Sequence, residues 1–121
     1  MRTGLEGLEA LVTGGGSGIG AACAAALTAA GARVTVMGRR PEPLQAMVAR
    51  GHAAAALAGD VTAPPALPRV ALLVNAAGAA ESAPFLASDA ALFERMWRVN
   101  LMGAVTVTRA SGRSRFIRMA K

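Results

Sequence analysis

The chain has 121 residues, which is enough for one domain at most, and its formal net charge is +6 at pH 7. Hydrophobic residues make up 54% of it, and it contains no tyrosine. The single cysteine, Cys23, excludes an internal disulfide and fits a reducing compartment. No segment has the pattern of a signal peptide or a membrane span, so we expect a cytoplasmic protein with no membrane partner.

Short apolar runs alternate with segments of helical periodicity along most of the chain. Strands are predicted at residues 8–13, 33–37, 52–58 and 70–74, the third weakly because alanine favours helix. Helices are predicted within residues 19–30, 41–50 and 89–111, where Gly31 and Gly51 end the first two and Ser88 or Asp89 caps the third. This order predicts an α/β fold with a partial doubly wound parallel sheet, Rossmann-like, of about four strands.

The link over residues 61–69 is short for a crossover between parallel strands. Its prolines, Pro64, Pro65 and Pro68, prevent a useful helix. Nine extended residues reach ~30 Å, which is just enough to pass over two strands to the far side of the first strand. We expect such a link to leave one face of the sheet poorly covered.

A glycine-rich loop over residues 14–20 follows the first predicted strand and precedes an alanine-rich helix. Backbone N–H groups at such a helix start, together with the helix dipole, form an anion site. No Lys-Ser/Thr pair follows the glycines, which excludes a P-loop. The spacing Thr13-Gly14-x-x-x-Gly18-x-Gly20 resembles the cofactor loop of the short-chain dehydrogenase/reductase family. The alternative is a glycine turn with a structural role only.

Two further motifs resemble this family where its cofactor's adenosine end binds. Gly38-Arg39-Arg40 follows the second strand, where dinucleotide folds place a ribose-binding acid or an arginine. Because there is no acid and a guanidinium can bind a 2′-phosphate, NADP(H) is favoured over NAD(H). Asp60-Val61 would contact the adenine. The alternatives are solvated arginines and an aspartate that only caps a turn.

Two more motifs resemble the family nearer to its reaction centre. Asn75-Ala76-Ala77-Gly78 is similar to its Asn-Asn-Ala-Gly, where small residues let the cofactor's ribose pass close to the backbone. Asn100 matches the family's catalytic helix asparagine, which can unwind a turn and bind a water in a proton relay. The resemblance implies no metal ligand, a catalytic role for Asn100, and cofactor contacts from Thr13, Gly14, Ser17, Gly18, Ile19, Gly20, Arg39, Arg40, Asp60, Val61, Asn75, Ala76, Ala77 and Gly78.

The resemblance covers only the first half of the family domain. It implies an NAD(P)-dependent oxidoreductase that transfers hydride between the nicotinamide and a small carbonyl or secondary alcohol. The family also uses a serine and a Tyr-x-x-x-Lys, but this chain has no tyrosine and its only lysine is Lys121. We therefore expect a truncated chain that is inactive alone. The alternatives are a non-catalytic nucleotide-binding or interaction module and a decayed gene fragment.

The expected domain spans residues 1–110, and residues 111–121 form a basic tail that we expect to be disordered. Nucleic-acid binding by this tail is disfavoured because no aromatic residues or recognition module accompany its arginines. In this arrangement the fourth strand lies on an open edge, which invites self-association or aggregation. The helix around Asn100 also exposes a face that, by the resemblance, packs on a partner subunit.

Overall fold

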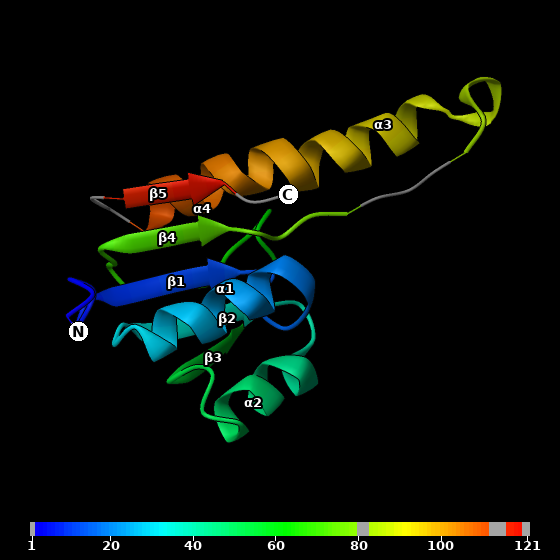
Figure 1. The fold of residues 1–121 in the computed structure, drawn as a ribbon. Helices are drawn as coiled ribbons and strands as arrows, with labels where there is room; N and C mark the ends of the chain where they lie inside the picture. Colours follow the sequence, from blue (N-terminus) through cyan, green and yellow to red (C-terminus); the bar gives the residue numbers. More distant parts are fainter. Residues whose placement is uncertain (1, 80–82, 112–115, 120–121) are drawn as a thin grey trace.

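The computed structural model describes residues 2–79, 83–111 and 116–119, and Figure 1 shows their fold. The elements follow in the order β1 (Glu9–Thr13), α1 (Gly18–Ala29), β2 (Arg33–Gly38), α2 (Pro41–Ala49), β3 (Ala55–Ala58), β4 (Leu72–Asn75), the 3₁₀ turn η1 (Phe85–Ala87), α3 (Ala90–Trp97), the π turn η2 (Arg98–Met102), α4 (Gly103–Ala110) and β5 (Phe116–Met119). The strands form one sheet in the order β3-β2-β1-β4-β5, and every pair is parallel. This confirms the predicted Rossmann-like class.

The fifth strand corrects two predictions about the end of the chain. β5 pairs with β4 in a register that sets Leu72 beside Phe116 and Asn75 beside Met119. The predicted disordered tail is therefore wrong for residues 116–119, and β4 is not an open edge. The physical reason is that β4 offers unpaired backbone groups, which an adjacent Phe-Ile-Arg-Met segment can satisfy. Residues 112–115 and 120–121 lie outside the described residues.

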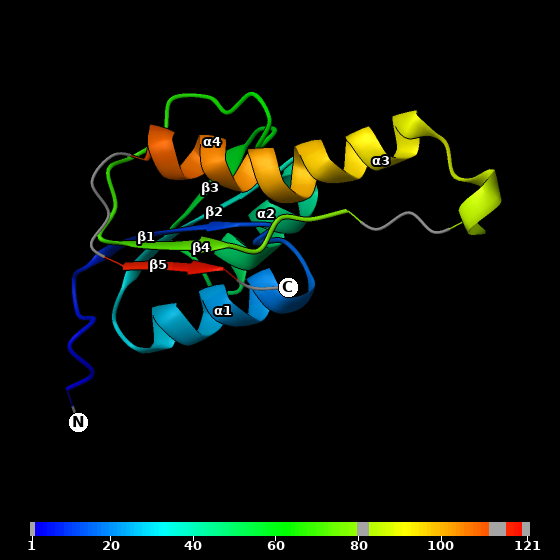
Figure 2. The ribbon, with the colours of Figure 1, turned by 90° about the horizontal axis from the view of Figure 1, so that it is seen from above.

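Helices and the link cover the two faces of the sheet, as Figure 2 shows from above. Because side chains alternate along a strand, Ala10 and Val12 lie on the face covered by α1 and α2, and Leu11 lies on the other. The first core also contains Ala24, Val34, Val36, Leu44 and Met47. The second core consists of Leu11, Met37, Val61, Val70, Leu73 and Val107.

The proline-rich link makes the predicted passage, since the strand order places β4 beside β1 rather than beside β3. Its expected poor cover of the sheet is only partly right. Val61 and Val70, at the two ends of the link, are buried in the second core, and Leu67 packs against that core. β3, in contrast, alternates between half-buried and exposed residues. The β3 side of the sheet is therefore the part that the link leaves poorly covered.

The helix predicted over residues 89–111 is confirmed as the continuous run α3, η2 and α4. Asp89 is its N-cap, because its Oδ1 accepts a hydrogen bond of 2.9 Å from the Leu92 N–H. No residue of α3 is buried, and in Figures 1 and 2 this helix extends beyond the strands. A π turn within a helix is rare and is often found at functional sites.

Thr13 ties the carboxyl ends of β1 and β4 together. It is 1% exposed, and its Oγ1 lies 3.2 Å from the N–H groups of both Ala76 and Ala77, from which it accepts. The same hydroxyl donates to the Val74 carbonyl at 3.5 Å. One buried side chain therefore positions the segment that follows β4.

Replacing Thr13 with valine should destabilise the fold by about 1–3 kcal/mol, because two part-buried backbone N–H groups lose their acceptor. The measurement is the free energy of unfolding in urea. Thr13→Ser keeps the hydroxyl and should recover most of the loss. Equal stability of Thr13→Val and the unaltered chain would contradict this role.

Candidate functional site

The loop between β1 and α1 requires glycine for two separate reasons. Gly14 and Gly18 have φ values of 63° and 55°, in the left-handed region that favours glycine. A Cβ at Gly14 would lie 2.7 Å from the Ala76 carbonyl oxygen, and a Cβ at Gly20 would collide with the Gly14 carbonyl. Side chains at these positions would push the loop away from the sheet, so the glycines set its path.

The start of α1 is available to bind an anion. Ser17 is the N-cap, and its side chain makes no capping hydrogen bond, while the first turn contains no acidic residue. The partial positive charge of the helix end is therefore not offset by its own side chains. A Cβ at Gly18 would meet no atom within 4 Å, so the backbone is open to close approach there.

A pocket of about 640 Å³ lies between this loop, α2 and the segment after β4, within the size range of small-ligand sites. It is at the carboxyl ends of the parallel strands, where α/β folds bind their ligands. Its lining includes Gly14, Ser17, Gly18, Ile19, Gly20, Arg39, Arg40, Asp60, Val61, Ala76, Ala77 and Gly78, all of them predicted site residues. Three further predicted residues, Thr13, Asn75 and Asn100, do not line this pocket.

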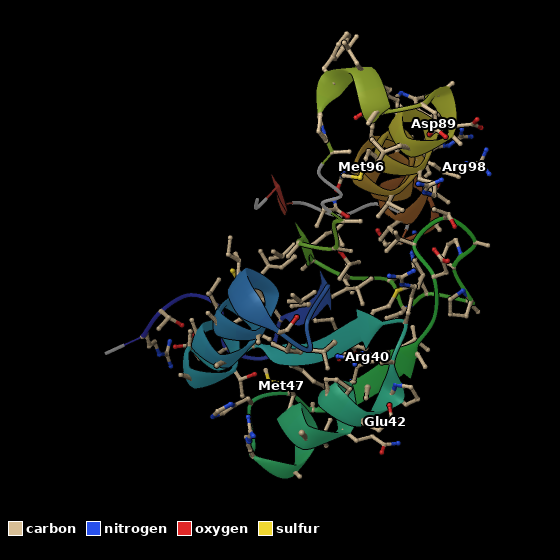
Figure 3. The ribbon with its side chains drawn as sticks, turned by 90° about the vertical axis from the view of Figure 1, so that its right-hand side faces the viewer. Arg40, Glu42, Met47, Asp89, Met96 and Arg98 are labelled. Carbon is tan, nitrogen blue, oxygen red and sulfur yellow. The ribbon has the colours of Figure 1, made fainter. Side chains whose placement is uncertain are left out.

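Arg39 and Arg40 bring positive charge to the end of β2. Both are exposed and line the pocket. Arg40 is also the N-cap of α2, and Figure 3, which looks at the carboxyl ends of the strands, shows it near Glu42 in the first turn. Guanidinium groups in this place suit a phosphate, which they can bind with two parallel hydrogen bonds.

Asp60 caps a turn, as the alternative interpretation of its sequence position held. Its Oδ1 accepts from the Thr62 N–H at 2.9 Å and from the Thr62 hydroxyl at 2.7 Å. These bonds, followed by the positive charge of Arg39, hold the pKa of Asp60 below the ordinary value of an aspartate. The group is therefore a carboxylate at neutral pH. Both hydrogen bonds end on one oxygen, Oδ1, and the residue still lines the pocket.

Asn100, in the π turn, pairs with the backbone of Ala79. Its Oδ1 accepts from the Ala79 N–H at 3.0 Å, and its Nδ2 donates to the Ala79 carbonyl at 2.9 Å. A Cβ at Gly78 would lie 2.9 Å from Asn100 Oδ1, so glycine permits this contact. The side chain thus holds the segment after β4 against the helix. Its role in a proton relay stays a prediction.

Sequence reasoning missed several residues of the pocket lining. Pro43 is one of them and lies against the predicted anion loop, since a Cβ at Gly16 would lie 2.9 Å from the Pro43 Cβ. The position of Gly59, directly before Asp60, was a usable signal. The position of Val99, directly before Asn100, was a signal of the same kind, whereas Pro43 and Leu44 carry none because they reach the pocket through the packing of α2.

Two further features concern the described residues, 2–79, 83–111 and 116–119. Within these ranges no group of three or more His, Cys, Asp or Glu side chains could hold a metal ion. In the same part of the chain no helix is long and apolar enough to cross a membrane.

The sequence of this chain is similar to those of several enzymes. L-xylulose reductase of Mesocricetus auratus is 34% identical over 99% of this chain and 52% of its own length. Galactitol 2-dehydrogenase of Rhizobium johnstonii is 37% identical over 91% of this chain and 49% of its own. The chain therefore spans about half the length of the curated relatives it matches.

Solved structures show the same relation in three dimensions. A short chain dehydrogenase/reductase family protein superposes with a TM-score of 0.81 at 34% identity, over 92% of this chain and 50% of that protein. A 3-oxoacyl (acyl-carrier-protein) reductase from Agrobacterium tumefaciens with NADP bound has a TM-score of 0.77 at 31% identity, over 89% and 47% respectively. The family model described as short chain dehydrogenase matches residues 9–115. With the glycine loop and the parallel sheet, this match shows that the chain belongs to the short chain dehydrogenase family.

Proposed function

We propose that this chain forms the cofactor-binding half of an oxidoreductase that prefers NADP(H) to NAD(H). The observation that carries the preference is the pair Arg39 and Arg40 lining the pocket at the end of β2. NAD-specific dinucleotide folds place an acidic residue there for the ribose 2′-hydroxyl, whereas arginine accommodates a 2′-phosphate. A similar reductase that has NADP bound supports this assignment. We also propose a cytoplasmic location, which the single cysteine supports.

Different residues of the pocket would bind the successive chemical groups of a dinucleotide. The glycine loop and the start of α1 would hold the pyrophosphate, and Arg39 and Arg40 the 2′-phosphate. Asp60 and Val61 would face the adenine, and Ala76 to Gly78 the ribose. When bound, the nicotinamide supplies hydride to a carbonyl or accepts it from a secondary alcohol. The protein's own contribution is to bind and orient the cofactor.

Replacing both Arg39 and Arg40 with alanine should weaken NADPH binding by about 10-fold to 100-fold, because charge-assisted hydrogen bonds to the 2′-phosphate are lost. NADH binding should change little, since NADH lacks that phosphate. Calorimetric titration with each cofactor measures the two affinities. Arg50→Ala, at the exposed end of α2, is the matched control for loss of positive charge. An equal loss for NADPH and NADH would contradict the preference.

A second candidate function for this chain alone is a non-catalytic nucleotide-binding module. The observation that favours it is the absence of any tyrosine from the 121 residues, together with a single lysine at the last position. In the family the tyrosine is the general acid and base, and Asn100 cannot replace it because an amide does not titrate near neutral pH.

We expect no NADPH oxidation by this chain over a panel of carbonyl compounds that includes L-xylulose, the compound in the name of one similar enzyme. Absorbance at the NADPH band measures the turnover. Cofactor binding without turnover supports the module, and absence of binding supports a decayed gene fragment. Reproducible turnover that Asn100→Ala abolishes would contradict the proposed inactivity.

We also propose self-association, through a helix face rather than the edge of β4, which β5 occupies. Phe93, Trp97, Leu101 and Val105 recur every four residues and form an apolar stripe, with 52%, 52%, 50% and 40% of their surfaces exposed. Asp89 and Arg109 continue the same spacing at its two ends. A second copy packed antiparallel would therefore place each aspartate near the partner's arginine while covering the stripe. Such a surface is self-complementary, as a two-fold dimer requires.

Trp97→Asp should weaken the dimer at least about 30-fold, because buried tryptophans often dominate interface energies. Sedimentation velocity over a concentration series measures the dissociation. Leu86→Asp is the control, since Leu86 is 97% exposed on η1 and lies outside the stripe. A monomeric unaltered chain, or equal effects of both substitutions, would contradict this surface.

A further inference from the structure

We propose that Thr108, on α4, is a positioning residue of the dinucleotide site, an inference that rests on the proposed function. Its Oγ1 donates to the Ala104 carbonyl at 2.7 Å and accepts from Asn75 Nδ2 at 3.2 Å. A hydroxyl has one proton, and Thr108 uses it within its own helix. Toward β4 the Thr108 oxygen can therefore only accept a hydrogen bond. The Asn75 amide must turn its NH₂ group, and not its oxygen, toward Thr108, so this contact sets the orientation of the amide.

The position of Asn75 connects this contact to the pocket. Asn75 ends β4, is 5% exposed and directly precedes Ala76 and Ala77, which line the pocket. The N–H groups of these two alanines are held by Thr13 from the β1 side. The junction between β4 and the segment after it is therefore held by Thr13 on β1 and by Thr108 on α4, in addition to the contact of Asn100 with Ala79 further along. Loss of either hold should let the pocket wall move.

α4 is a firm support for such a hold. Val107, next to Thr108, is fully buried and packs in the core that contains Leu11 and Leu73. At the other end of the helix, a Cβ on Gly103 would lie 2.5 Å from Val61 Cγ2, so glycine allows α4 to approach a pocket residue closely. Because packed helices resist small displacements, α4 keeps Thr108 in place. If the contact with Asn75 is broken, Asn75 can therefore move while Thr108 stays where it is.

Thr106 offers a matched control on the same helix. Its Oγ1 donates to the Met102 carbonyl at 2.7 Å, the same bond within the helix that Thr108 makes, and both residues are half-buried. Residues two apart do not share a helix face, so Thr106 is directed away from the side that meets Asn75. Substitution of Thr106 removes only the hydrogen bond within the helix, whereas substitution of Thr108 removes that bond and the contact with β4. The difference between the two variants therefore measures the contact with β4.

The experiment compares Thr108→Val, Thr108→Ser and Thr106→Val by calorimetric titration with NADPH and by hydrogen exchange of the Ala76 and Ala77 amides. Thr108→Val should weaken NADPH binding by about threefold to tenfold, the usual effect of one lost hydrogen bond, and speed exchange at both amides. Thr108→Ser should restore both properties, and Thr106→Val should alter neither. Equal changes in Thr108→Val and Thr106→Val would overturn the proposal.

The exchange measurement keeps this test separate from the proposed function. If the unaltered chain binds no NADPH, the proposed function fails, whereas faster exchange at Ala76 and Ala77 in Thr108→Val alone still supports the hold by Thr108. If Thr108→Val does not fold, exchange of the Asn75 side-chain amide in the unaltered chain decides. Slow exchange of those protons supports the contact with Thr108, and exchange at the rate of an exposed asparagine overturns it.

Discussion

The close approach of three backbone segments at the end of β1 is the constraint on which the site depends. Gly14 contacts the backbone of Ala76 and Ala77 on one side and that of Gly20 on the other, with no room for a Cβ at Gly14 or Gly20. This approach lets α1 begin directly against the sheet and brings the segment after β4 to the same place. The pocket is the space that remains in front of these contacts, and Thr13 keeps its rear wall fixed.

Local interactions hold the charged and polar groups around the pocket in place. Asp60 is kept ionised by Thr62, and it offsets part of the positive charge of Arg39. The start of α1 keeps its partial positive charge because its first turn contains no acidic residue. Binding an anion there needs little rearrangement, since the donors belong to backbone that the fold already holds.

Much of this was predictable, because the informative signals are local. The spacing of Gly14, Gly18 and Gly20 reports a turn geometry, and the apolar periodicities report strands and helices of nearby residues. β5 was not predictable from its own four residues alone, since its pairing depends on the edge of β4, which is distant in the sequence. The contact between Asn100 and Ala79 was missed for the same reason. An asparagine within a helix indicates an irregular turn, but it does not indicate which distant segment its side chain contacts.

The parallel pairing of β5 also determines how the molecule can be handled. Its register sets Met119 beside Asn75, so β5 ends at the carboxyl ends of the strands, where the pocket lies. The chain enters β1 at the opposite, amino ends of the strands, as Figure 1 shows. A fluorophore or purification tag attached after β5 would be placed at the same end of the strands as the pocket. The same group placed before β1 would be separated from the pocket by the full length of the strands, and would report on the molecule without disturbing the pocket.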